Sequence, residues 1–155
     1  MTSATKRRVA IIGAGVSGLC SVKSCLECGI LEPVCFEQSD TIGGLWCYKE
    51  TISKLPGEGS VMKTTSINTS KEVMAFSDFP PPSHFYSFMH HSQVFEYLRL
   101  YADHFKLWAH IRLQTKINYI KRSDDYEETG KWDVTYESLW KHLIQKHVFA
   151  ESNKM

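Results

Sequence analysis

Three glycines at the spacing G-x-G-x-x-G are the residues of this sequence best suited to binding a phosphate group. Gly13, Gly15 and Gly18 follow directly on Val9–Ile12, an apolar run typical of a parallel strand that is buried on both faces. The first glycine can take a tight turn, the second lets a pyrophosphate approach the backbone, and the third lets a helix pack closely on the strand. Free N–H groups at the start of that helix would then bind the pyrophosphate of a dinucleotide.

A carboxylate stands where a dinucleotide site needs one. Glu37 ends a second strand-like segment, Pro33–Glu37, at about the 20-residue offset from the last glycine that is expected for an acid on a ribose. This carboxylate would repel a 2′-phosphate, so we expect FAD or NAD at the adenosine end, and NADP only at another site. A strand–turn–helix that binds nothing is the alternative.

The cysteines indicate a reducing compartment rather than a redox or metal centre. There are five, an odd number: Cys20, Cys25, Cys28, Cys35 and Cys47. The first apolar run is broken at Gly13, so we expect no secretory signal and therefore reduced thiols. Cys25 and Cys28 form C-x-x-C but fall late in the expected first helix, away from the end where the dipole lowers a thiol pKa, which favours packing. We assign no metal, because neither a second cysteine pair nor a histidine motif completes a site.

Other segments must form the elements that hold these residues in place. The sequence predicts a helix from about Val16 to Cys28, and apolar residues at helical spacing predict another over Ser92–Phe105 with Ser92 as its N-cap. Ile111–Ile120 and Trp132–Tyr136 alternate as two strands of a β-hairpin, and Leu139–Val148 has helical spacing. The expected fold class is therefore α/β: a Rossmann-like domain with a parallel sheet, plus a helix and a β-hairpin.

The composition excludes several classes of function. The chain has 155 residues, of which 43% are hydrophobic, and a formal net charge of +1. It can fill the core of one domain or a little more. The sequence contains no basic block interleaved with aromatic residues, so we expect no nucleic-acid partner. The sequence contains no uninterrupted apolar run of about 18 residues, so we expect no transmembrane helix in it.

A second glycine pair and a hydroxyl-rich stretch are further candidates for contact with a ligand. Gly43 and Gly44 precede Leu45 and Trp46, which could cover a flat or charged group, although Trp46 could equally be a core residue. The stretch Thr64–Glu72 is too polar for a buried strand.

Six segments in order make the chain resemble the N-terminal part of the flavin-containing monooxygenases of animals, over about Arg8 to Val134. They are Gly13–Gly18, Phe36–Glu37, Ile42–Trp46, Ser66–Glu72, Asp78–Pro80 and Ser92–Leu98. Such enzymes use NADPH to reduce FAD and pass one oxygen atom of O2 to a soft nitrogen or sulfur nucleophile. The resemblance therefore implies FAD and NADPH as cofactors and small amines or sulfur compounds as substrates.

The resemblance also implies residue roles. The pyrophosphate would lie on Gly13, Ala14, Gly15, Val16, Ser17 and Gly18, the adenosine ribose on Glu37 with Gln38 beside it, and the flavin against Leu45 and Trp46, with Asn68 and Thr69 facing its ring. Asn68 is the implied catalytic residue, because an asparagine at this position helps to preserve the oxygenated flavin and contacts the nicotinamide cofactor. Thr69 replaces the serine common in the family but keeps the hydroxyl.

Departures from the family pattern limit what we expect of this chain alone. Residues 1–136 are expected to be a partial FAD-binding domain and residues 137–155 a divergent tail. The family's NADPH motif, a strand that closes the FAD sheet and the anchor in the endoplasmic reticulum membrane are expected to be absent, so the truncated chain alone should be inactive. Two alternatives remain: a noncatalytic FAD-binding remnant or interaction fragment, and a disulfide reductase that uses Cys25 and Cys28.

Overall fold

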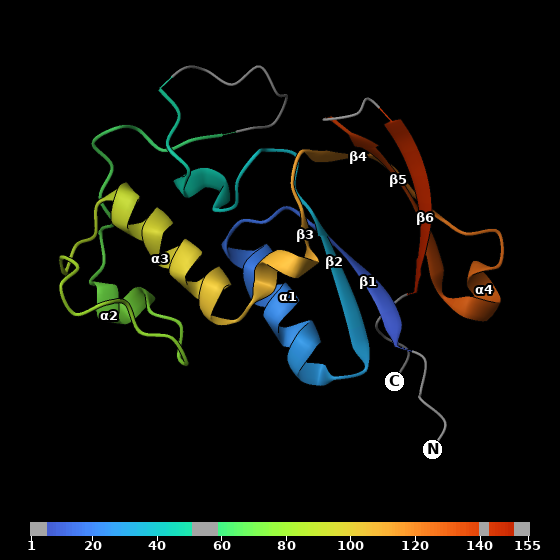
Figure 1. The fold of residues 1–155 in the computed structure, drawn as a ribbon, viewed down its shortest axis with the longest axis horizontal. Helices are drawn as coiled ribbons and strands as arrows, with labels where there is room; N and C mark the ends of the chain where they lie inside the picture. Colours follow the sequence, from blue (N-terminus) through green and yellow to red (C-terminus); the bar gives the residue numbers. More distant parts are fainter. Residues whose placement is uncertain (1–5, 51–58, 140–142, 151–155) are drawn as a thin grey trace. The chain divides into compact units, whose positions relative to one another are not determined.

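The chain forms two compact units, unit 1 of residues 1–41 and 107–155 and unit 2 of residues 42–106. A computed structural model describes residues 6–50, 59–139 and 143–150 (Figure 1). Unit 1 contains β1 (Arg7–Ile12), α1 (Val16–Cys28), β2 (Leu31–Phe36), η2 (Leu107–His110), β3 (Ile111–Arg112), β4 (Thr115–Arg122), α4 (Tyr126–Thr129), β5 (Lys131–Ser138) and β6 (Leu143–Ala150). Unit 2 contains η1 (Gly44–Trp46), α2 (Lys71–Met74) and α3 (His91–His104).

A parallel sheet of order β1-β2-β3 is the centre of unit 1. Ile12 is paired with Phe36 at the last position of β1 and β2. Because the strands are parallel, the glycine turn after β1 and the acid after β2 leave the sheet at the same edge. Pro33 is tolerated within β2 because β3 pairs only with Cys35 and Phe36, and leaves the earlier part of β2 with one strand partner.

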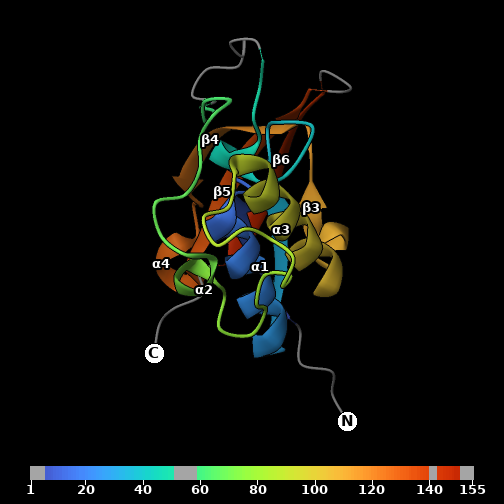
Figure 2. The ribbon, with the colours of Figure 1, turned by 90° about the vertical axis from the view of Figure 1, so that its left-hand side faces the viewer.

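Helix α1 packs on one face of this sheet and has the bounds expected from the sequence. Leu19 and Val22 on its inner face are fully buried. The helix ends where Gly29 takes a left-handed conformation, with φ +74°, and donates its N–H to Leu26 O. Figure 2, turned by 90°, views unit 1 from the helix side, with α1 in front of the strands.

An antiparallel sheet of order β4-β5-β6 packs on unit 1's parallel sheet through an aromatic cluster. The buried members of this cluster are Phe36, Val134, Tyr136 and Phe149. The expected helix over 139–148 is wrong where the structure describes it, because residues 143–150 form β6. Gln145, His147 and Phe149 recur at every second position, as in a strand, and each contacts Tyr136 or a ring beside it. Residues 140–142 lie outside the described part of the chain.

The expected strand over Ile111–Ile120 is also corrected, because the chain changes sheet inside it. Gln114 takes a left-handed conformation with φ +50° and donates its N–H to Ser39 O. The two residues of β3 therefore pair with β2, and β4 begins only at Thr115. The expected hairpin is confirmed as β4 and β5, which pair from Thr115 opposite Ser138 to Arg122 opposite Trp132.

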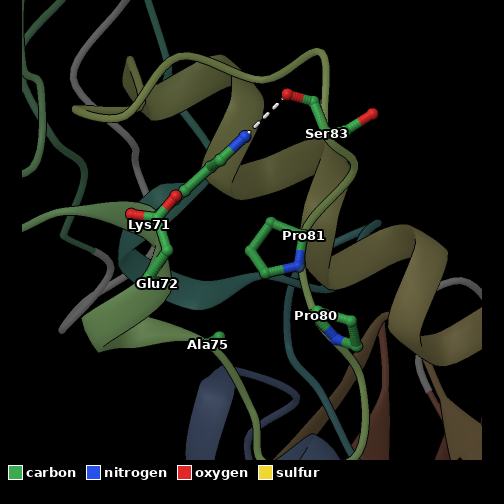
Figure 3. A pocket seen from close by; sticks show the side chains of 6 residues that line it. All are labelled: Lys71, Glu72, Ala75, Pro80, Pro81 and Ser83. Atoms are coloured by element: carbon green, nitrogen blue, oxygen red, sulfur yellow. Dashed lines mark hydrogen bonds between the residues drawn. The ribbon is translucent and has the colours of Figure 1, made fainter.

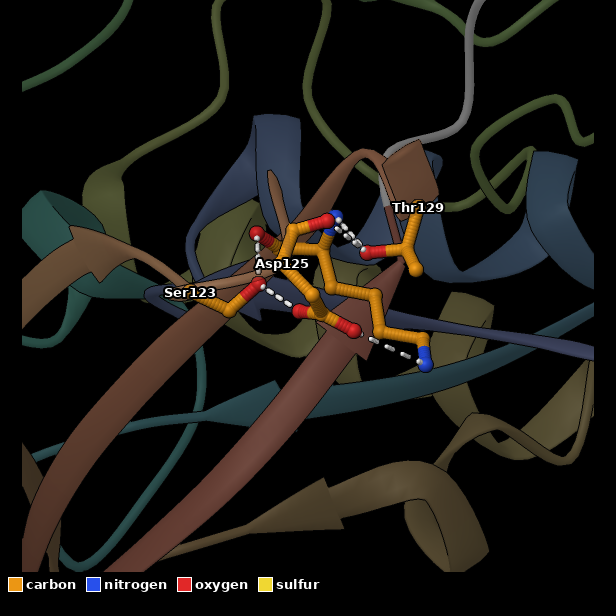
Figure 4. Close-up of polar contacts among 4 residues, drawn as sticks. Ser123, Asp125 and Thr129 are labelled. Atoms are coloured by element: carbon orange, nitrogen blue, oxygen red, sulfur yellow. Dashed lines mark hydrogen bonds and ion pairs between the residues drawn. The ribbon is translucent and has the colours of Figure 1, made fainter. Parts of the chain in front are cut away.

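Side-chain hydrogen bonds close the turn between β4 and β5 (Figure 4). The Ser123 hydroxyl lies 2.6 Å from Asp125 Oδ1, and the Thr129 hydroxyl donates to Asp125 O at 2.9 Å. The hydrogen bond from Ser123, helped by the Lys131 ammonium, lowers the pKa of Asp125. The turn is therefore stabilised by local contacts.

His147 makes the stability of unit 1 depend on pH. Its ring stacks on Tyr136, and burial, followed by the charges of Arg8 and Arg112, lowers its pKa below the usual 6.5. The unfolded chain therefore binds this proton more tightly. The neutral His147 ring therefore contributes its full share of the folding stability above about pH 6.5. That contribution is lost as the pH falls through the lower pKa of the folded state. We expect the unfolding free energy, measured by urea titration, to fall less between about pH 7.5 and 5.5 in His147→Phe than in the wild type. An equal fall in both would contradict this.

The core of unit 2 lies between α3 and the loops that precede it. Its buried members are Ile67, Phe85, Met89, Val94 and Tyr97. Helix α3 was expected to begin after an N-cap at Ser92, but the N-cap is His90, whose ring nitrogen accepts the N–H of Ser92. An imidazole acceptor here fills the role that a serine hydroxyl usually has.

Tyr97 carries the main polar contact of this core. Its hydroxyl donates to Phe79 O and accepts from Phe76 N at 3.0 Å, while the side chain is fully buried. Tyr97→Phe removes this hydroxyl from both main-chain groups, so we expect a loss of about 1–3 kcal/mol in unfolding free energy. Tyr86→Phe, at a position 73% exposed, is the control and should change it by less than about 0.5 kcal/mol. Equal effects in the two variants would show that the Tyr97 hydroxyl stabilises nothing.

Candidate functional site

Two glycines of the turn after β1 cannot take a side chain without strain or overlap. Gly13 has φ +88°, a conformation that strains any residue with a Cβ. A Cβ on Gly18 would lie 1.9 Å from Gly13 O. The first turn of α1 therefore touches the backbone of the turn that leads into it, as the G-x-G-x-x-G spacing predicts.

The start of α1 presents main-chain N–H groups that no side chain caps. Gly15 is the N-cap residue and makes no side-chain cap hydrogen bond, and the first turn of this 13-residue helix contains no acidic residue. The early N–H groups of a helix lack partners within it, and the helix dipole adds partial positive charge there. Val16, Ser17 and Gly18 contribute these N–H groups, which suit an anionic group such as a pyrophosphate.

The Glu37 carboxylate lies directly on the glycine turn. Its Oε2 accepts the N–H of Ala14 at 2.7 Å, and its Oε1 accepts the N–H of Ser39 at 2.8 Å. The Ser39 hydroxyl lies 2.8 Å from Oε1 and 2.7 Å from Thr41 O, and its one proton can go to either oxygen. The residue is only 7% exposed. The structure therefore brings Glu37 together with the glycine turn across the edge of the sheet.

The carboxylate still has room for one more donor. The two oxygens of a carboxylate offer about four acceptor positions, of which Ala14 and Ser39 use at most three. The remaining position is on Oε2, beside the glycine turn, where a ribose hydroxyl could donate. The residues of unit 1 thus fit the adenosine and pyrophosphate part of a dinucleotide.

Two residues that support this site were not expected to do so from the sequence. Ser39 fixes one oxygen of the carboxylate, and the Cys35 thiol lies 3.5 Å from Gly13 O as its donor. Burial, with the charge of Glu37 second, raises the pKa of Cys35 to about 12, so the thiol keeps its proton for that bond. A serine two residues after the acid is a signal that could have been noticed. Gln38, between them in the chain, is half-buried.

In unit 2, Leu45 and Trp46 form part of a 3-10 turn after a tightly packed glycine. Gly43 has φ +103°, and a Cβ there would lie 2.8 Å from the Phe95 ring. Trp46 is half-buried and packs against the core of unit 2, which favours the core role that the sequence left open. Leu45 is 56% exposed and leaves an apolar side chain free to cover a ligand.

Asn68 and Thr69 are exposed on a connection that is held at both ends. Ile67 N donates to Met89 O at 2.9 Å, and Lys71 N donates to Ser87 O at 2.6 Å. Both bonds go to the same segment of unit 2. Asn68 and Thr69 lie between these two bonds and are both exposed.

Cys25 and Cys28 lie in the last two turns of α1, as expected from their late position in the predicted helix. Burial, followed by the charge of Cys28, raises the pKa of Cys25, whereas a redox thiol needs a lowered pKa. This argues against the disulfide reductase alternative. Within the described residues, no group of three or more histidine, cysteine or acidic side chains could hold a metal ion.

Comparison with known sequences identifies close relatives. The model of a family described as flavin-binding monooxygenase-like matches residues 6–150. Flavin-containing monooxygenase 5 of Homo sapiens is 51% identical over 134 residues, which are 86% of this chain and 25% of the relative. Dimethylaniline monooxygenase (N-oxide-forming) 2 of Rattus norvegicus is 45% identical over 143 residues, which are 92% of this chain and 26% of the relative. The chain thus spans about a quarter of the length of these curated relatives.

Solved structures share the fold. S-allyl-L-cysteine S-oxygenase from Allium sativum has a TM-score of 0.80 at 24% identity, covering 94% of this chain and 35% of that one. Cyclohexanone monooxygenase from Rhodococcus sp. Phi1 bound to NADP+ has a TM-score of 0.66 at 24% identity, covering 93% and 25%. These likenesses confirm the predicted α/β fold class. The family match includes β6, and the expected division at residue 136 stays a prediction. Among the described helices, none combines the length and apolarity needed to cross a bilayer.

Proposed function

The chain belongs to the flavin-binding monooxygenase-like family, and from this membership we propose that it binds FAD as part of a monooxygenase that uses NADPH and O2. The observation that carries the proposal is the Glu37 carboxylate, which accepts the Ala14 N–H beside an uncapped helix N-terminus. FAD, when bound, supplies the redox chemistry that activates O2 in such enzymes. The protein supplies binding, orientation and exclusion of water.

The residue roles in this proposal are those that the resemblance to the family implies, taken for each unit by itself. In unit 1, the turn Gly13–Gly18 holds the pyrophosphate through the main-chain N–H groups from Gly15 onward, because those of Gly13 and Ala14 donate to Phe36 O and to Glu37. Glu37, with Gln38 beside it, holds the adenosine ribose. In unit 2, Leu45 and Trp46 contact the flavin, and Asn68 and Thr69 face its ring. The exposure of Asn68 and Thr69 and the apolar surface of Leu45 support these roles.

The proposed substrates are small molecules with a soft nitrogen or sulfur atom. The names of an N-oxide-forming relative and of an S-oxygenase with the same fold support this class. By resemblance to the family, the proposed place of the activity is the endoplasmic reticulum membrane. The alternative of a noncatalytic FAD-binding remnant shares the FAD site and makes the same prediction for FAD binding.

Titration of the purified chain with FAD and with FMN tests the proposed site. FMN carries the same flavin ring but lacks the adenosine and the second phosphate. We expect quenching of flavin fluorescence to show FAD binding at least about 100-fold more tightly, because the contacts to a ribose and a pyrophosphate contribute several kcal/mol. Equal affinities, or no binding of FAD, would overturn the proposal.

A further inference from the structure

Lys71 links two segments of unit 2 through its ammonium group. Nζ lies 2.8 Å from Ser83 O, 2.8 Å from Phe85 O and 3.2 Å from Pro82 O. A lysine ammonium has three N–H donors, so the three carbonyls can use all of them. Figure 3 shows the side chain reaching toward Ser83.

Lys71 lines a pocket, but its ammonium group does not serve as a ligand-binding group there. The pocket has a volume of about 420 Å³ and is lined by Lys71, Glu72, Ala75, Pro80, Pro81 and Ser83 (Figure 3). Because the ammonium faces main-chain carbonyls, it is not available to an anionic ligand in the pocket. We therefore consider the main-chain segment that the ammonium group holds in place.

The segment that Lys71 holds is short of main-chain donors. Pro80, Pro81 and Pro82 have no N–H group, and Phe85 N donates to Pro82 O. Phe85 itself is 5% exposed in the core of unit 2. The ammonium therefore fixes the carbonyl side of a loop whose far end is anchored in that core. Hydrogen bonds from a charged donor are about twice as strong as neutral ones.

The same loop continues into the segment that holds Asn68 and Thr69. Two main-chain bonds on either side of these residues, from Ile67 N and Lys71 N, end on Met89 O and Ser87 O. Lys71 thus contacts this partner segment twice, through its main chain at Ser87 and through its side chain at residues 82–85. Loss of the ammonium group would loosen both the segment that carries Asn68 and Thr69 and the loop that it contacts.

We propose that Lys71 is a positioning residue, which holds Asn68 and Thr69 in the orientation that faces the flavin. The inference rests on the proposed function, because it takes these two residues to contact the ring. Lys71 itself touches no ligand in this arrangement. Its effect should therefore appear in the environment of the flavin ring rather than in the binding of the adenosine half.

Three variants of the full chain separate these effects. Lys71→Met removes the charge and keeps the aliphatic stem, Lys71→Arg restores a cationic donor, and Lys63→Met is the same change at an exposed lysine of unit 2. We expect the FAD dissociation constant of Lys71→Met to stay within about threefold of the wild type, because the glycine turn and Glu37 are untouched. The absorption bands of its bound flavin should shift toward those of free FAD, while Lys71→Arg restores them partly and Lys63→Met leaves them unchanged.

A double-mutant cycle shows whether Lys71 acts through Asn68. Asn68→Ala should shift the flavin bands in the same direction, and adding Lys71→Met to Asn68→Ala should change them little further. Additive shifts would show that Lys71 acts elsewhere. Bands in Lys71→Met identical to those of the wild type would overturn the proposal.

Hydrogen exchange provides a readout that needs no cofactor. In Lys71→Met, the main-chain N–H groups at positions 67 and 71 should exchange about tenfold faster than in Lys63→Met. The reason is that the charge-assisted hydrogen bonds that hold the loop are lost. The N–H groups of β1 and β2 should not change. Failure of the wild type to bind FAD would defeat the proposed function alone, whereas unchanged exchange at positions 67 and 71 would defeat the role of Lys71.

Discussion

Gly18→Ala is expected to abolish detectable FAD binding and to destabilise unit 1 by more than about 3 kcal/mol. The added Cβ would lie 1.9 Å from Gly13 O and 3.0 Å from its carbonyl carbon. Both atoms belong to the backbone, so no side-chain rotation can relieve the overlap. Either α1 moves away from β1 or the turn opens, and both changes displace the N–H groups proposed to hold the pyrophosphate. Urea unfolding and FAD titration measure the two effects.

Gly29→Ala is the matched control at the other end of α1. Gly29 has φ +74°, but a Cβ there meets nothing within 4 Å. Its substitution therefore adds only the strain of the left-handed conformation, about 1–2 kcal/mol, and should leave FAD affinity unchanged. Equal losses of stability in the two variants would contradict the close approach of helix and turn.

Glu37→Gln is expected to weaken FAD binding by about 10- to 100-fold, because a charge-assisted hydrogen bond contributes about 1.5–3 kcal/mol. Glutamine keeps the size but turns one acceptor oxygen into a donor NH2 group. That group must then face either the Ala14 N–H or the donors of Ser39. We therefore expect an added loss of about 1–3 kcal/mol in unfolding free energy.

Two controls make the Glu37 measurement specific. Glu32→Gln is the same change at an exposed position of β2 and should alter neither stability nor binding. FMN lacks the adenosine ribose, so its weaker binding should be the same in wild type and Glu37→Gln. A loss of FMN affinity equal to the loss of FAD affinity would show that the carboxylate supports the fold and does not contact the ribose.

The core of the candidate site could be predicted because a strand–turn–helix–strand unit demands particular residue types at fixed spacing. It needs a glycine with positive φ, a glycine where the helix meets a carbonyl, and an acid after the next strand, and Gly13, Gly18 and Glu37 occur at that spacing. The support around the site could not be predicted so well. Ser39 and the Cys35 thiol act through contacts that only a folded backbone creates.

The sequence by itself determined the strand–turn–helix unit from β1 to the acid after β2, the bounds of α1 and the family. Only the tertiary structure decided that residues 143–150 form β6, that the chain changes sheet at Gln114 and that His90 caps α3. The physical reason is that each of these segments fits more than one local structure, and the groups it meets in the folded chain decide between them. A short apolar run fits either a helical or a strand period, and the element that it meets decides between them. Residues 143–150 meet the edge of β5 that β4 leaves unpaired, and the ring of Tyr136.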